Sequence, residues 1–340
     1  MFELEKIIRT NIKELKPYAS ARDEFSGKEG VFLDANENPF GTLNRYPDPH
    51  QTVLKKKLSD VKCVSPENIF IGNGSDEIID LVFRIFCEPA KDKVLTFSPS
   101  YGMYDVSAAI NNIELIKIPL TNTFQIDFDL LENYMNDAAL KIIFICSPNN
   151  PSGNNVHGIE TILKKFNGIV FIDEAYIDFS TGKSFLSKID EYSNLIVSQT
   201  FSKAWGLAAA RVGIAYANKL LIDLLNKVKP PYNVSGLNQD AALAALYNSD
   251  VFEERKTIIL EQKLFLQKEL QSISGVKKIY PTDANFILIE VEDADKTYNE
   301  LVSKKVITRN RNNAVKNCIR ITIGTPEENK ILINALAQIK

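Results

Sequence analysis

The segment KIIFICSPNNPSGN (residues 141–154) joins an almost unbroken apolar run to a turn rich in proline and asparagine. β-branched and aromatic residues in such a run favour a strand that is buried on both faces, which is typical of a parallel sheet. Six similar runs occur at residues 68–72, 93–97, 114–118, 168–172, 194–198 and 212–217. Amphipathic stretches such as residues 75–86 and 159–166 lie between them. This alternation predicts an α/β domain with a mostly parallel central sheet covered by helices.

The pattern changes after KPPYN (residues 229–233). The residues that follow predict two long helices, two strands and a terminal helix, at residues 235–248, 251–273, 284–291, 318–324 and from Thr325–Pro326 onward. We therefore expect a large domain over residues 46–232. A smaller α+β domain would combine residues 1–45 with residues 233–340, and residues 31–36 predict a strand that packs with it.

The composition argues against several classes of protein. A net charge of −3 without an extended basic tract gives no footprint for nucleic acid. No apolar stretch approaches the roughly 20 residues of a membrane span, and the first ten residues lack a signal-peptide core, so a cytoplasmic location is expected. Four cysteines without metal-ligand spacing predict neither a metal site nor a disulfide framework. Because His50 and His157 are the only histidines, an enzyme would rely on lysine, tyrosine or carboxylates to move protons.

Polar loops follow four of the predicted strands: GNGSDE (72–77), SPSYGMY (98–104), SPNNPSGN (147–154) and IDEAYIDF (172–179). Open α/β sheets bind ligands at this carboxyl edge. The first loop lacks the third glycine of a dinucleotide fingerprint, because Glu77 stands there, yet it leads into a helix N-terminus that suits a phosphate. Structural roles stay open for single residues: Ser75 as a helix cap, Tyr101 as a packing residue and Asp173 as a turn residue.

The segment QTFSKAWGLAAARVG (residues 199–213) places Lys203 among small and apolar residues. Taken alone, this lysine would more often be a surface residue whose stem packs on apolar neighbours. A desolvated lysine near positive charge is nucleophilic at neutral pH, and the hydroxyls of Thr200 and Ser202 with Arg211 would suit a phosphate. Asp173, which closes an apolar strand, needs a cationic partner. A lysine, a carboxylate, a stacking aromatic ring and a phosphate cup are the parts that pyridoxal 5′-phosphate requires.

These motifs resemble those of the class I/II aminotransferases of fold type I. The segment TFSKAWGLAAARVG (200–213) is similar to the motif of the cofactor-bearing lysine, and DEAY (173–176) and NNPSG (149–153) are similar to the other signatures. The resemblance covers almost the whole chain. Within this family, further segments resemble the histidinol-phosphate aminotransferases: PYASAR (17–22), DANENP (34–39), RYPDP (45–49), SYGMY (100–104) and IRITIG (319–324).

The resemblance implies a role for each residue of the cofactor site. Lys203 would hold pyridoxal 5′-phosphate as a Schiff base and then carry the proton between substrate and cofactor. Asp173 would pair with the ring nitrogen, and Tyr101 would stack on the ring. Tyr176 and Asn150 would hydrogen-bond the ring oxygen. The phosphate would bind at Ser75, Asp76, Thr200, Ser202 and Arg211.

The same resemblance implies a homodimer in which Tyr46 reaches the cofactor phosphate in the other subunit. The implied reaction, a step of histidine biosynthesis, converts L-histidinol phosphate and 2-oxoglutarate to imidazole acetol phosphate and L-glutamate. The substrates would bind at Tyr18, Asn36, Arg309 and Arg320, because guanidinium groups suit both phosphate and carboxylate. Arg311 is close enough in sequence to replace Arg309.

Two groups of alternatives remain. An aromatic amino-acid aminotransferase or a threonine-phosphate decarboxylase would share nearly every cofactor residue. A nucleotide-binding dehydrogenase, or a dimer of this fold without catalysis, would not hold a cofactor on Lys203. The sequence departs from the family pattern at Ser152, Trp205 and Ala209, where threonine, a smaller aromatic residue and glycine are usual, and none of these changes removes a catalytic group.

Overall fold

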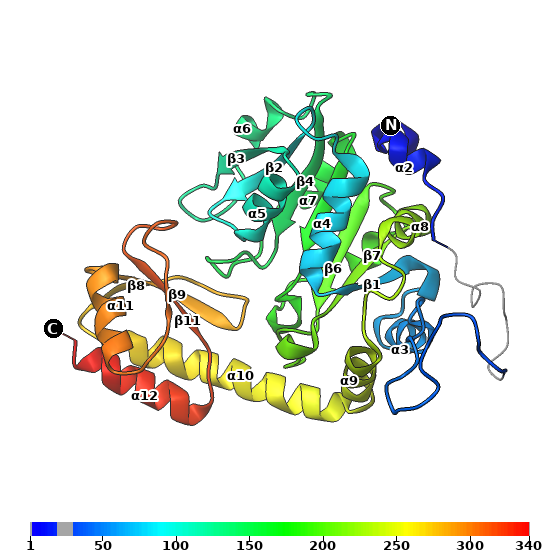
Figure 1. The fold of residues 1–340 in the computed structure, drawn as a ribbon. Coiled ribbons are helices and arrows are strands. Elements are labelled where there is room, and N and C mark those ends of the chain that lie inside the picture. Colours follow the sequence, from blue (N-terminus) through cyan, green and yellow to red (C-terminus); the bar gives the residue numbers. More distant parts are fainter. Residues whose placement is uncertain (1, 19–29, 340) are drawn as a thin grey trace.

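The computed structural model describes residues 2–18 and 30–339, and a seven-stranded sheet forms its centre (Figure 1). The strand order is β1-β7-β6-β5-β4-β2-β3. The strands are β1 (Ile69–Asn73), β2 (Lys93–Ser98), β3 (Glu114–Pro119), β4 (Leu140–Cys146), β5 (Ile169–Asp173), β6 (Leu195–Thr200) and β7 (Val212–Ala217). Only β7 runs antiparallel to its neighbours, β1 and β6. The expected mostly parallel sheet is confirmed, and its strands lie within two residues of their predicted ends.

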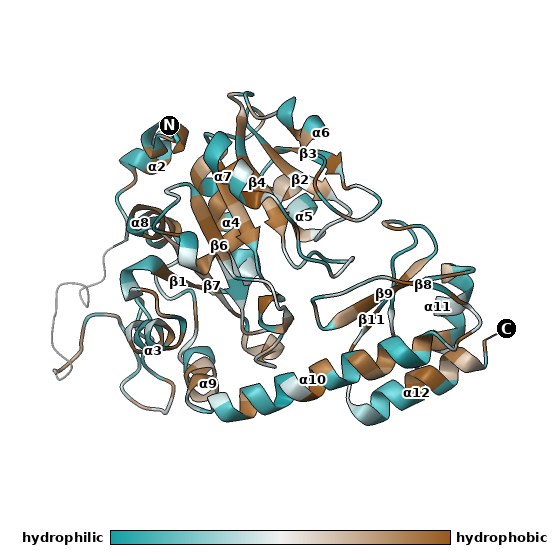
Figure 2. Cartoon of the chain, turned by 180° about the vertical axis from the view of Figure 1, so that it is seen from behind, coloured by the Kyte–Doolittle hydropathy of each residue, from teal (hydrophilic) through white to brown (hydrophobic). Residues whose placement is uncertain are grey.

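Helices cover both faces of this sheet, as Figure 1 shows. One face packs on α4 (Ser75–Phe86), α5 (Met103–Ile110) and α8 (Lys219–Val228). The other face packs on α3 (Thr52–Lys62), α6 (Phe128–Glu132), α7 (Ile159–Lys165) and α9 (Gly236–Tyr247). In β4, Ile142 and Phe144 belong to the first core and Ile143 and Ile145 to the second. Burial on both faces explains the unbroken apolar runs. Figure 2, coloured by hydropathy, shows the central strands mostly in brown, the colour of hydrophobic residues.

A second, antiparallel sheet has the order β10-β11-β9-β8. Its strands are β8 (Val276–Ile279), β9 (Phe286–Val291), β10 (Arg309–Asn310) and β11 (Cys318–Thr322). Three helices pack a separate core against it: α10 (Ser249–Leu270), α11 (Ala294–Ser303) and α12 (Pro326–Ala337). Thr325 caps α12, as the sequence predicts, and Glu328 completes a capping box. The long helix α10 reaches from α9, beside the large sheet, to this second core (Figure 1).

Short 3₁₀ helices lie in the connections: η2 (Pro66–Asn68), η3 (Ile177–Phe179), η4 (Phe185–Lys188) and η5 (Ala208–Ala210). In the described ranges 2–18 and 30–339, no helix combines the length and the apolar character needed to cross a bilayer. A cluster of three or more His, Cys, Asp or Glu that could hold a metal ion is likewise absent from these ranges.

The N-terminal segment differs from the expectation. Residues 31–36 form no strand, because neither sheet pairs with them, and Val31 and Leu33 are each 88% exposed. The helices α1 (Leu4–Ile7) and α2 (Thr10–Glu14) pack on the large domain, where Ile8 and Ile12 join the core of α4 and α8. The expectation that this segment packs with the second domain is therefore wrong for residues 2–14. Residues 19–22 of the PYASAR motif lie outside the described residues.

Candidate active site

A cavity at the carboxyl ends of β4, β5 and β6 brings most of the predicted cofactor residues together. It is lined by Ser75, Asp76, Tyr101, Cys146, Asp173, Ala175, Tyr176, Thr200, Ser202, Lys203 and Arg211. Of the residues expected around the cofactor, Asn150 lies next to this set through the Tyr176 hydroxyl, which accepts a hydrogen bond from Asn150 Nδ2 at 3.4 Å. The carboxyl ends of five strands that run parallel to one another, β1, β2, β4, β5 and β6, thus converge on one space.

Asp173 ends β5 and is 3% exposed. Its Oδ2 accepts a hydrogen bond from the Tyr104 hydroxyl at 3.0 Å, and its Oδ1 accepts one from the Ala175 amide at 3.1 Å. Burial raises the pKa of this carboxyl to about 6, although both hydrogen bonds oppose the shift. An ionised carboxylate at this depth is therefore stabilised by any cation that enters the cavity.

Lys203 follows β6 in a turn that is open to solvent. Its Nζ lies 5.6 Å from the centre of the Tyr176 ring. Partial desolvation and the positive charge of Arg320 lower the pKa of Lys203, whereas Asp173 opposes this shift. More of the amine is neutral at physiological pH than in an ordinary surface lysine, which favours its use as a nucleophile.

The N-terminus of α4 forms the other end of the cavity. The turn before it needs Gly74, whose φ is +79°, and a Cβ on Gly213 of β7 would lie 2.3 Å from the Ser75 amide nitrogen. Such close passage requires glycine at residue 213. Arg211 extends its guanidinium to Asp76, with Nη2 3.2 Å from Oδ2. Free amides, the helix dipole and an arginine together make an anion-binding site.

The second domain adds two arginines beside Asn150. Asn150 Oδ1 accepts hydrogen bonds from Arg320 Nη1 at 2.5 Å and from Arg311 Nη2 at 3.3 Å. Both guanidinium groups keep a buried Nε for which no partner exists among the described residues. Desolvation and neighbouring positive charge lower the pKa of both. Arg309 is the register partner of Arg320 but is exposed, so Arg311 is the arginine that contacts the cavity wall beside Arg320.

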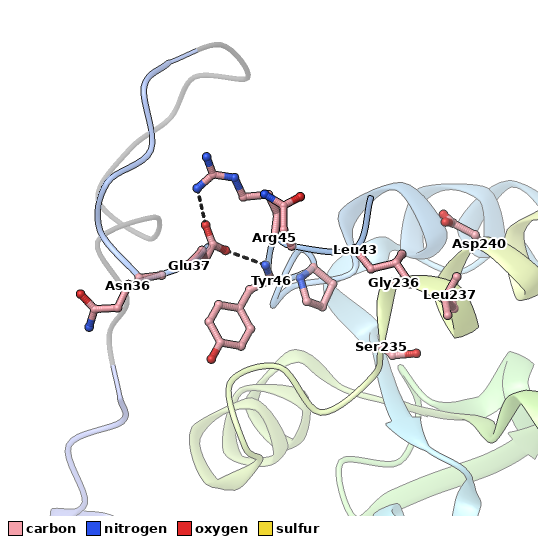
Figure 3. Close-up of a pocket in the computed structure, with 12 residues that line it drawn as sticks. Asn36, Glu37, Leu43, Arg45, Tyr46, Ser235, Gly236, Leu237 and Asp240 are labelled. Atoms are coloured by element: carbon pink, nitrogen blue, oxygen red, sulfur yellow. Dashed lines mark hydrogen bonds and ion pairs between the residues drawn. The ribbon is translucent and has the colours of Figure 1, made fainter. Parts of the chain in front are cut away.

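Other predicted residues lie away from Lys203 within this chain. Asn36 and Tyr46 line a separate pocket formed by residues 35–37, 43–47, 235–237 and 240 (Figure 3). The Tyr46 ring stacks on Tyr232 with centroids 4.4 Å apart, and its amide donates to Glu37. Tyr18 is 72% exposed.

Sequence reasoning missed Tyr104 and Cys146. Tyr104 donates to Asp173, and Cys146, the last residue of β4, lines the cavity. Cys146 ends a predicted strand and Tyr104 ends the predicted loop of residues 98–104, so each could equally be a packing residue. The one signal is that Tyr104 lies three residues after Tyr101, and the centroids of the two rings are 5.7 Å apart although Tyr101 precedes α5.

Comparison with known proteins identifies the family. The sequence matches the family model described as aminotransferase class I and II over residues 25–336. The chain belongs to this family. The aminotransferase is 51% identical over 346 residues to the histidinol-phosphate aminotransferase of Christiangramia forsetii, an alignment that covers 100% of this chain and 99% of the relative.

Solved structures of the family share the architecture of this aminotransferase. The histidinol-phosphate aminotransferase from Clostridium acetobutylicum aligns with a TM-score of 0.80 and 25% identity, covering 87% of this chain and 90% of the other. The enzyme from Sinorhizobium meliloti, solved in complex with pyridoxal-5'-phosphate, aligns with a TM-score of 0.79 and 22% identity over 97% of each chain. The fold type I architecture expected from the sequence is thereby confirmed.

Proposed function

We propose that this aminotransferase holds pyridoxal 5′-phosphate in the cavity between Asp173 and the N-terminus of α4. The observation that carries the proposal is the shared cavity itself, which presents a buried carboxylate, a lysine with a lowered pKa and an anion-binding helix end. These donors and acceptors fit the cofactor's ring nitrogen, carbonyl and phosphate respectively. When bound, the cofactor supplies a carbonyl that binds amines and an electron sink for the substrate's α-carbon.

In this proposal, residues of the chain bind the cofactor and orient its ring. Asp173 would accept a hydrogen bond from the protonated ring nitrogen and stabilise its positive charge, and burial of the carboxylate limits competition from water. Tyr176 and Asn150 would hydrogen-bond the ring oxygen, and Tyr101, whose hydroxyl donates to Asp76 at 3.1 Å, would stack on the ring. Lys203 would carry the proton to and from the substrate's α-carbon. The phosphate would bind to the backbone amides of Ser75 and Asp76 and to the side chains of Thr200, Ser202 and Arg211.

We infer that the amino donor is L-histidinol phosphate and that the acceptor is 2-oxoglutarate. The relative from Christiangramia forsetii, which is 51% identical over 99% of its length, is named histidinol-phosphate aminotransferase. The arginines beside Asn150 suit an anion, and both reactants carry one. Arg309 is exposed next to Arg320 and would bind the negative charge of the substrate that lies farther from the cavity. Tyr18 and Asn36 lie away from the cavity of their own chain, so they would contact substrate only in the cavity of another subunit.

The four cysteines are unpaired, which supports the expected cytoplasmic location.

A substrate panel tests this assignment. Purified protein loaded with cofactor is assayed with histidinol phosphate, aromatic amino acids and threonine phosphate, and both the transferred amino group and released CO₂ are measured. Turnover of histidinol phosphate well above that of the others is expected. No turnover of histidinol phosphate would reject the proposed donor, and CO₂ release from threonine phosphate would favour a decarboxylase.

Arg320→Gln is expected to lower kcat/KM about 100-fold for both histidinol phosphate and 2-oxoglutarate, since a hydrogen-bonded ion pair contributes about 1.5–3 kcal/mol. The effect falls on both substrates because one guanidinium binds the anion of each in turn. Steady-state kinetics of the two half-reactions measure it. Arg255→Gln, an exposed arginine on α10, serves as the control and should leave both values unchanged. A loss confined to one substrate would contradict a shared anion site.

We also propose a homodimer. Four apolar side chains before Tyr46 are 72–88% exposed: Val31, Leu33, Phe40 and Leu43. Leu237 on α9 borders the same pocket and is 59% exposed (Figure 3). Such a patch is typical of a protein interface. A second copy that covers it would bring Tyr46 toward the other copy's cavity, which Tyr46 does not reach within its own chain.

Mixing two impaired variants tests the shared site. Lys203→Ala lacks its own lysine, and Tyr46→Phe lacks the hydroxyl that it would lend to the other subunit. Subunit exchange would create dimers with one intact site, so activity should rise toward about a quarter of the wild-type value, above the sum of the separate variants. Light scattering should show a dimer at micromolar concentration. Activity equal to the sum, or a monomer, would contradict the proposal.

A further inference from the structure

Tyr104 is a buried tyrosine whose hydroxyl points at the carboxylate of Asp173, the proposed partner of the cofactor's ring nitrogen. We propose, resting on the proposed function, that Tyr104 is a positioning residue that holds Asp173 in its charged form and in one orientation. The Tyr104 hydroxyl lies 3.0 Å from Asp173 Oδ2, and the side chain is 0% exposed. Tyr104 itself does not line the cavity, so it acts through Asp173.

The surrounding rings fix the position of the Tyr104 hydroxyl. The Tyr104 ring stacks on Phe144 of β4 with centroids 4.9 Å apart and an interplanar angle of 19°. The Tyr101 ring meets it edge-on, at 5.7 Å and 89°. Close packing on two sides bars rotation of the ring. The donor is therefore preorganised before any ligand enters.

Asp173 has few other groups that favour its ionised form. Its Oδ1 accepts from the Ala175 amide, so the Tyr104 hydroxyl is the side-chain hydrogen-bond donor that the structure gives to this carboxylate. The charged or titratable groups around it are Asp76 on α4, Tyr101 and Tyr104 at α5, Cys146 on β4, Tyr176 after β5 and Lys203 after β6. Lys203 is the cation among these groups, and in the proposed function it would be covalently linked to the cofactor.

Tyr104 stays a neutral donor throughout the working pH range. Burial and the negative charge of Asp173 hold the pKa of its phenol well above the usual value. A neutral phenol donates its proton to the carboxylate without adding a charge of its own. Without this donor, Asp173 would take a proton more readily, and the ring nitrogen of the cofactor would lose its charged partner.

Tyr104→Phe removes the hydroxyl and keeps the ring that packs on Phe144. One hydrogen bond to a charged group corresponds to about a tenfold change, so kcat should fall and the cofactor dissociation constant should rise by about tenfold each. The KM for substrate should stay within about twofold, since the arginines are untouched. The pH midpoint of the visible absorption of the loaded enzyme should move upward, because a less positive ring makes the attached lysine nitrogen easier to protonate.

Tyr216→Phe is the matched control. Tyr216 is also 0% exposed and lies in β7 of the same sheet, but its hydroxyl has no hydrogen-bond partner among the described residues. This variant should leave the absorption midpoint and the cofactor affinity unchanged. Equal changes in both variants would show a general effect of altering the core and would overturn the proposal.

A double-mutant cycle keeps the test decisive if Tyr104→Phe is less stable. In an Asp173→Asn background, Tyr104→Phe should cause no further loss of cofactor affinity, because its effect passes through the carboxylate. Additive losses would overturn the proposal, as would a Tyr104→Phe enzyme with a wild-type absorption midpoint. If the wild-type protein binds no cofactor, the proposed function fails; if it binds and Tyr104→Phe behaves normally, only the role of Tyr104 fails.

Discussion

Lys203→Ala is expected to abolish turnover, lowering kcat by at least about four orders of magnitude, because it removes both a nucleophile and a general acid–base group. The amine faces the cavity beside Asp173 and Tyr176, and its lowered pKa suits both tasks. No other lysine lines this cavity among the described residues. The visible absorption of the loaded protein and its loss on borohydride treatment measure the covalent link, and a kinetic assay measures turnover.

Lys263→Met provides a matched control for this loss. Lys263 on α10 is also partly desolvated with a lowered pKa, but its Nζ donates to the Thr282 carbonyl oxygen at 3.3 Å, outside the cavity. The control should keep its absorption band and its turnover. Turnover of Lys203→Ala above about one hundredth of the wild-type value would contradict the assignment, since general acid–base catalysis alone contributes at least that much.

The large sheet could be predicted because both of its faces are buried. In β4, successive residues from Ile142 to Ile145 enter opposite cores, so each of these positions must be apolar and the run is easy to recognise. Residues 31–36 carry a similar local pattern yet form no strand, because a strand also needs a neighbouring edge that no local sequence reveals. The short β10 pairs through two residues only, which is below what periodicity can detect.

The candidate site was predictable where a residue follows a strand of the large sheet. Asp173 and Lys203 meet because parallel strands end at a common edge, and this rule needs no side-chain detail. The choice of Arg311 beside Arg320 depends on how the second domain places its β10–β11 turn, and the contact of Tyr104 with Asp173 depends on how α5 packs over β4. Both are long-range packing results that spacing along the chain does not determine.

Asp173→Asn should weaken cofactor binding about 100-fold and lower kcat by at least about 1,000-fold, because a neutral amide does not stabilise a cationic ring nitrogen.

The same change should stabilise the cofactor-free protein at pH 8. The folded-state pKa of Asp173 is raised from 3.8 to about 6, so the folded protein favours the protonated carboxyl. Folding free energy from this group is present below pH 4 and is lost as the pH rises through 6, by at most about 3 kcal/mol.

Urea unfolding of the cofactor-free proteins at pH 8 and pH 4 measures how Asp173→Asn changes the free energy of unfolding. Asp173→Asn should be more stable than the wild type by about 1–3 kcal/mol at pH 8, with the difference shrinking toward pH 4. Glu174→Gln is the matched control for cofactor binding, since Glu174 is also buried with a raised pKa but contacts Ser184 and Gln199 outside the cavity. Glu174→Gln should keep most of its cofactor affinity. Equal loss of affinity in both variants, or a less stable Asp173→Asn protein at pH 8, would show that Asp173 is a structural carboxylate rather than the partner of a cation.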